Sequence, residues 1–129
     1  MSRTTDRLEQ LRQLAKLRSD MELRRFSAFR NHVTAMRDRI DGLQHDLAAL
    51  YHVDGAFSVP EAQLVNTMAG DLARQIIRTE TELQQMLPGF EAARQDAVRE
   101  FGRADVLRQI RENLIAEQKQ QAQKKQVNS

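Results

Sequence analysis

The sequence predicts an all-α protein: a long antiparallel two-helix coiled-coil hairpin whose second helix is longer than the first. Apolar residues recur every three or four positions along most of the chain, as they do on one face of a helix. Glycine and proline number only 5 and 2, so few turns are available. The one clear turn signal lies at residues 53–59. We therefore expect two helices joined by that turn.

The composition is that of helices which bury a narrow apolar stripe. The chain has 129 residues, which suits a single domain over 1–129, and its apolar and aromatic fractions are 40% and 5%. There is no cysteine, which excludes disulfides and thiolate metal sites. No run of about 18 apolar residues is present, and the N-terminal residues are polar and charged. We expect a cytoplasmic protein that does not insert into a membrane.

The charge is close to balanced. Lysine and arginine total 20 against 18 acidic residues, which gives a net charge of +2. A dedicated nucleic-acid-binding protein concentrates positive charge on one surface, and no such concentration is visible along this chain. Nucleic acid is therefore a weak candidate partner.

The first helix is expected at about residues 6–52. Thr4, Thr5 or Asp6 offers a side chain to cap its N-terminus, and Asp6 with Glu9 has the spacing of a capping box. Two apolar series follow, with a change of phase between them after Met21. The first series is Leu8, Leu11, Leu14, Leu17 and Met21. The second, with heptad spacing, is Phe26, Phe29, Val33, Met36, Ile40, Leu43, Leu47 and Leu50.

The second helix is expected at about residues 60–118. Ser58 has the spacing to cap it together with Glu61, and Pro60 suits a first helical turn. Its apolar series has one irregular step near its start. The series is Val65, Met68, Leu72, Ile76, Thr79, Leu83, Met86 and Phe90.

Pro88 interrupts this second helix. Proline removes a backbone donor and clashes with the preceding turn, so either one helix is kinked there or a third helix starts there. The apolar phase continues past Pro88 to Ala93 and Ala97, so we favour the kink. Residues 119–129 have almost no apolar content and are expected to be a disordered tail.

No pattern in the sequence predicts catalysis, a cofactor or a metal. His45 and His52 share a helix face with Asp41, but further ligands at tetrahedral angles are not evident. The glycines are dispersed, so no phosphate-binding loop is present. Because a two-helix hairpin has no enclosed cleft, we expect a non-enzymatic protein that binds other proteins.

Three features resemble the stalk protein of flagellar and type III protein export systems. They are a leucine-rich segment at residues 8–15, a turn in the fifties, and a late aromatic residue followed by basic and leucine positions at 101–108. In that family, two long antiparallel helices form a coiled coil. The departure is Pro88-Gly89, which is unexpected in a straight stalk.

The resemblance implies a cytoplasmic adaptor of the export apparatus, peripheral to the inner membrane. The joined terminal ends of the hairpin would enter a hexameric export ATPase ring, and the tip would contact the export gate or chaperones. The tip residues implied are Leu47, Tyr51, Met68 and Leu72. The residues expected to bind the ring are Phe101, Arg103, Leu107 and Ile110.

Two alternatives to this function remain open. One is a self-associating structural coiled coil, in which two hairpins pair into a four-helix bundle. The other is a nucleic-acid-binding coiled coil that uses its arginine pairs.

Overall fold

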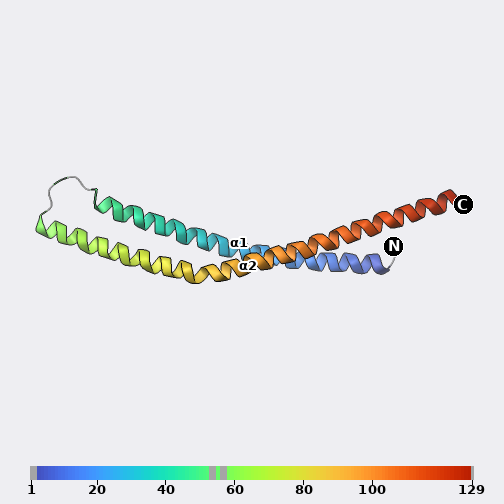
Figure 1. The fold of residues 1–129 in the computed structure, drawn as a ribbon, viewed down its shortest axis with the longest axis horizontal. Coiled ribbons are helices and arrows are strands. Elements are labelled where there is room, and N and C mark those ends of the chain that lie inside the picture. Colours follow the sequence, from blue (N-terminus) through green and yellow to red (C-terminus); the bar gives the residue numbers. More distant parts are fainter. Residues whose placement is uncertain (1–2, 53–54, 56–57, 129) are drawn as a thin grey trace. The chain divides into compact units, whose positions relative to one another are not determined.

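Two helices account for nearly all of the chain in a computed structural model, which describes residues 3–52, 55 and 58–128. Helix α1 spans Arg3–Leu50 and helix α2 spans Val59–Asn128. In Figure 1 the colours follow the sequence, so α1 runs from blue to green and α2 runs from green through yellow to red. The two helices pack against each other. The described residues form no strand. The prediction of an all-α helical hairpin with a longer second helix is confirmed.

The N-terminus of α1 differs from the prediction. Because the helix begins at Arg3, the expected capping residues Thr4, Thr5 and Asp6 lie inside its first turns. Thr5 is buried, and its hydroxyl accepts a hydrogen bond of 3.1 Å from the side chain of Gln118 in α2. Thr5 therefore contacts the other helix, and the capping prediction was wrong.

The start of α2 agrees with the prediction. The backbone N–H of Glu61 donates to the Ser58 hydroxyl at 3.3 Å, which is the expected N-cap, and Pro60 lies in the first turn. Gly55 has a φ of 124°, a conformation that favours glycine. Residues 53, 54, 56 and 57 of the predicted turn lie outside the described residues.

Helix α2 is longer than expected, and it is a single helix, as the continuing apolar phase favoured. It passes through Pro88 without a break, so a third helix starting there is excluded. Met86, Leu87 and Phe90 pack against the apolar core on either side of the proline, and this burial offsets the lost backbone hydrogen bond. The helix also continues to Asn128 where a disordered tail was predicted. The tail is rich in glutamine, lysine and alanine, which are strong helix formers.

The single domain predicted for residues 1–129 contains two compact units. Unit 2 comprises Ala28–Glu91, and unit 1 comprises the chain up to Ser27 together with the chain from Ala92 onward. Each unit therefore contains one segment of α1 and one segment of α2. The two units are described separately below.

Large apolar side chains fill unit 2. Val33, Met36 and Ile40 of α1 form a buried cluster with Leu83 of α2. This confirms the central part of the heptad predicted for the first helix. In α2 one predicted position was wrong: Ala69 is 6% exposed, whereas the expected Met68 is 45% exposed. Val65, Ala69, Leu72 and Ile76 therefore follow a regular heptad, and the irregular step disappears.

This packing predicts a large difference between two leucines of α2. Leu83 is 8% exposed and Leu64 is 61% exposed. Leu83→Ala is expected to lower the free energy of unfolding by about 2–4 kcal/mol, because it leaves a cavity in the core. Leu64→Ala should change it by less than about 0.5 kcal/mol. Urea unfolding followed by circular dichroism at 222 nm checks both values; equal losses would contradict the core described here.

Candidate partner-binding surface of unit 1

Small and polar residues fill the contact between the two helices of unit 1. We call the row of residues that each helix turns toward the other its seam. On α1 the buried or half-buried positions step back from Phe26 by four and three residues in turn. They are Glu22, Ser19, Ala15, Arg12, Leu8 and Thr5. This row keeps the heptad of the Phe26 series, so there is no change of phase.

The seam predicted for the start of the first helix was therefore correct at Leu8 and wrong at its other four positions. Ala15 is 9% exposed and lies in the seam, whereas Leu17 is 61% exposed. Leu11, Leu14 and Met21 are exposed as well. The leucine spacing of three and four residues is a sound helical signal. It marks an apolar stripe on α1 that does not face α2.

The seam of α2 in unit 1 is also composed mainly of small and polar residues, with half-buried Leu107 and Leu114 among them. Ala93 and Ala97 are buried and Ala104 is half-buried. Glu100 and Arg111 occupy the same heptad row, with half-buried side chains. Alanine side chains remove little apolar surface from water, so this contact gains less from burial than the core of unit 2 does.

Polar contacts connect the two helices of unit 1 instead. Arg111 of α2 forms an ion pair with Glu9 of α1. A nitrogen of Arg25 lies 3.8 Å from an oxygen of Asp96. The hydrogen bond from Gln118 to Thr5 is a third contact of this kind. The three contacts connect α1 and α2 at different positions along unit 1.

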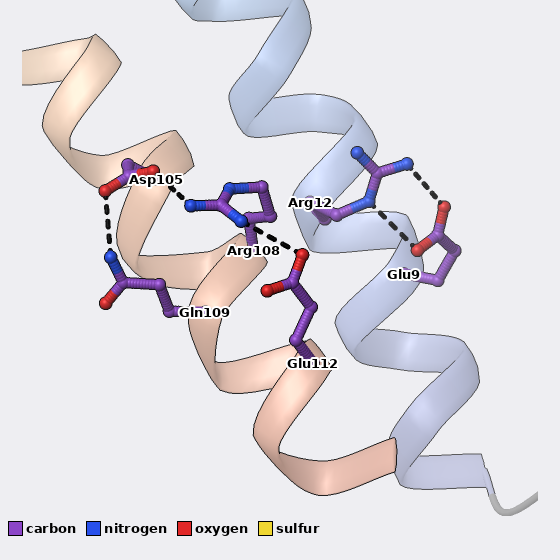
Figure 2. A network of polar contacts seen from close by, with 6 residues as sticks. All are labelled: Glu9, Arg12, Asp105, Arg108, Gln109 and Glu112. Atoms are coloured by element: carbon purple, nitrogen blue, oxygen red, sulfur yellow. Dashed lines mark hydrogen bonds and ion pairs between the residues drawn. The ribbon is translucent and has the colours of Figure 1, made fainter. Parts of the chain in front are cut away.

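The side chains around Glu9 form local networks along each helix. Figure 2 shows Arg12 beside Glu9 on α1, with nitrogen–oxygen distances of 3.0 and 2.8 Å. On α2, Arg108 lies between Asp105 at 2.8 Å and Glu112 at 3.0 Å. The hydrogen bond from Arg12, helped by the positive charges of Arg111 and Arg12, lowers the pKa of Glu9 from 4.5 to about 2 against an opposing effect of burial.

An apolar groove runs along one side of unit 1. Its volume is about 480 Å³, within the range of ligand and peptide sites. Leu11 and Leu14 line it from α1, and Val106 and Leu107 line it from α2. Arg18, Arg103 and Glu100 also line it. We call this feature the unit 1 groove.

The ring-binding residues expected from the sequence all lie in unit 1, but not on one surface. Arg103 and Leu107 line the unit 1 groove, and Arg103 pairs with Glu100 at 2.9 Å. Phe101 is 59% exposed and lines a separate hollow with Leu23 and Arg108. Ile110 is exposed.

The tip residues expected from the sequence lie in unit 2. Leu47 and Leu72 are half-buried seam residues. Tyr51 and Met68 are exposed. The predicted tip surface is therefore reduced to two exposed side chains, since the leucines are needed for packing between the helices.

Sequence reasoning missed the unit 1 groove because it assigned the leucines of the first helix to the seam. Counting the heptad backwards from Phe26 would have placed Ala15 and Ser19 in the seam instead. The same count leaves Leu11, Leu14 and Arg18 outside it. The sequence therefore contained a signal for the groove: the heptad of the Phe26 series continues toward the N-terminus mostly through small and polar residues.

Neither a metal site nor a membrane span is found within the described residues. Between residues 3 and 128, omitting the undescribed positions of the turn, no group of three or more histidine, aspartate or glutamate side chains is arranged to hold a metal. The Nδ1 atom of His52 lies 2.7 Å from the Ala48 carbonyl oxygen. Neither described helix has a segment apolar and long enough to cross a bilayer.

No family model, curated protein or solved structure matches this chain.

The lowered pKa of Glu9 predicts a pH effect. A carboxylate with a folded-state pKa below its unfolded value stabilises the fold fully above about pH 4.5, and loses that effect as the pH falls toward about 2. Glu9→Gln should therefore lower the midpoint of thermal unfolding near pH 7. Between pH 4.5 and 2 the midpoint of this variant should fall less than that of the wild type. Glu117→Gln removes an exposed carboxylate from the same unit and serves as the control. Thermal unfolding at several pH values checks this, and superimposable profiles for wild type and Glu9→Gln would contradict it.

Proposed function

We propose that this chain is a non-enzymatic coiled-coil adaptor of the flagellar or type III protein export apparatus. In this role unit 1 binds inside a hexameric export ATPase ring. Exposed residues of unit 2, including Tyr51 and Met68, contact the export gate or a chaperone. The protein acts by presenting surfaces, without a cofactor and without a reaction of its own.

The observation that supports this proposal is the unusual division of apolar residues in unit 1. The contact between its helices uses mainly alanine, serine, threonine and charged residues, with a few half-buried leucines, while large apolar side chains are exposed on both helices. Exposed large apolar residues gathered in one region are typical of protein-binding sites. Burying them against a partner would supply the apolar contact that the seam of unit 1 lacks.

Self-association is the second candidate function. The same exposed residues, Leu11, Leu14, Leu17 and Met21, favour it, because two copies could cover each other's apolar stripes. Sedimentation equilibrium at micromolar concentrations separates the two functions. A monomer excludes the structural coiled coil, and a stable dimer that buries these leucines would replace the adaptor proposal.

The adaptor proposal predicts a selective loss of ATPase binding. Phe101→Ala and Ile110→Ala remove exposed apolar side chains of unit 1 at little cost to folding. Together they should weaken binding to the purified export ATPase by about 30-fold or more, the effect of losing one strong interface anchor. Ile77→Ala is the matched control, since Ile77 is 63% exposed but belongs to unit 2.

Binding is measured by the anisotropy of labelled chain titrated with the ATPase from the same cell. Absence of any binding by the wild-type chain would refute the export role. Equal weakening by Ile77→Ala would refute the assignment of the ring contact to unit 1.

A further inference from the structure

The unit 1 groove has the shape and charge to accept one further helix. We propose that it binds an amphipathic α-helix of a partner protein, with acidic residues beside the apolar face of that helix. The inference goes beyond the export role, because it concerns the chemistry of the bound segment. It holds equally if the partner belongs to another assembly.

The geometry of the groove fits a helix of about two turns. Leu11, Leu14 and Arg18 follow one line along α1, and the helix rises about 10 Å between Leu11 and Arg18. Val106 and Leu107 form the opposite side. An amphipathic helix places apolar residues at the same three- and four-residue spacing, so its side chains can fill a groove of this kind.

Gly102 keeps part of the groove wall open. A Cβ atom built on Gly102 meets no atom within 4 Å, although the residue lies in the middle of a helix. In a helix interior, glycine is less favourable than every other residue except proline. No packing contact requires a glycine at position 102. Its absent side chain leaves space on the side where the groove lies.

The charge beside the groove is positive on its α1 side. Arg18 and Arg103 line the groove itself, together with Glu100. Helical spacing places Arg7 one turn before Leu11 on α1, and Arg99 one turn before Arg103 on α2. On α2, Glu100 pairs with Arg103 at 2.9 Å and Asp96 lies 3.5 Å from Arg99. On α1, Glu22 lies one turn after Arg18 and shares a smaller hollow with it.

Because the α2 arginines are paired, the positive margin of the apolar floor lies on the α1 side, at Arg7 and Arg18. Acidic side chains at the edges of a bound helix would pair with them, which favours an acidic occupant over a basic one.

A second copy of this chain fits the groove less well. In a symmetric pair the same surface meets itself, so a groove lined by two arginines and one glutamate would meet a second surface of the same net positive charge. Like charges held opposite each other oppose association. A partner helix with acidic margins avoids this repulsion while it covers the same leucines.

Two designed peptides test the proposal. Each is an 18-residue amphipathic helix with the same leucine face; one carries glutamate beside that face and the other carries lysine. Fluorescence anisotropy of each labelled peptide is recorded with the full chain. The glutamate peptide is expected to bind at least tenfold more tightly than the lysine peptide.

Two variants locate the binding. Gly102→Leu adds a side chain at the open wall of the groove. It should weaken the binding of the glutamate peptide at least tenfold. Gly42→Leu is the matched control, because a Cβ at Gly42 also meets no atom within 4 Å but lies in unit 2. Arg18→Glu with Arg103→Glu should reverse the preference in favour of the lysine peptide. Circular dichroism confirms that each variant remains helical.

Each outcome decides for or against the groove. The proposal is supported if the wild-type chain prefers the glutamate peptide, if Gly102→Leu loses this preference, and if the double charge variant reverses it. No binding of either peptide, or equal binding of both, overturns it. Self-association of the wild-type chain that Gly102→Leu abolishes would also overturn it, because the occupant would then be a second copy. None of these results depends on whether the export ATPase binds.

Discussion

The structure depends on what fills the heptad positions at which the two helices meet. In unit 2 these positions hold mainly valine, methionine, isoleucine and leucine, so the contact is largely an apolar core. In unit 1 they hold mainly alanine, serine, threonine and charged residues, and ion pairs replace much of the apolar burial. Apolar burial is the main favourable term in folding, so the two contacts differ in strength although their spacing is the same.

The polar seam of unit 1 explains why its leucines are exposed. A helix has room for one seam toward its partner, and the heptad of α1 assigns that seam to Ala15 and Ser19. Leu11 and Leu14 then lie beside the seam and form a groove with Val106 of α2. A surface of this kind costs solubility unless something covers it, which is the physical basis for treating unit 1 as a binding element.

Much of the fold could be predicted from the sequence, and the register of unit 1 could not. The Phe26 series and the Ser58 cap each combine a periodic pattern with specific chemistry, and both predictions were correct for the described residues. In the N-terminal part of α1, the leucines that form the strongest apolar pattern are mostly exposed to solvent. The assumption that these leucines pack against the second helix therefore selected the wrong face of α1. The continuation of the helix through Pro88 was indicated by the apolar phase, which carries on to Ala93 and Ala97, although proline by itself disfavours it.

Cysteine labelling tests the register of unit 1 most directly, because the chain has no cysteine of its own. Single substitutions Ser19→Cys and Leu17→Cys place a thiol in the seam and on the exposed stripe, respectively. The account predicts that the thiol at position 17 reacts with a maleimide at the rate of an exposed thiol, and that the thiol at position 19 is strongly protected. Protection at position 17 with rapid reaction at position 19 would show that the leucines face α2, and it would contradict both the groove and the function proposed from it.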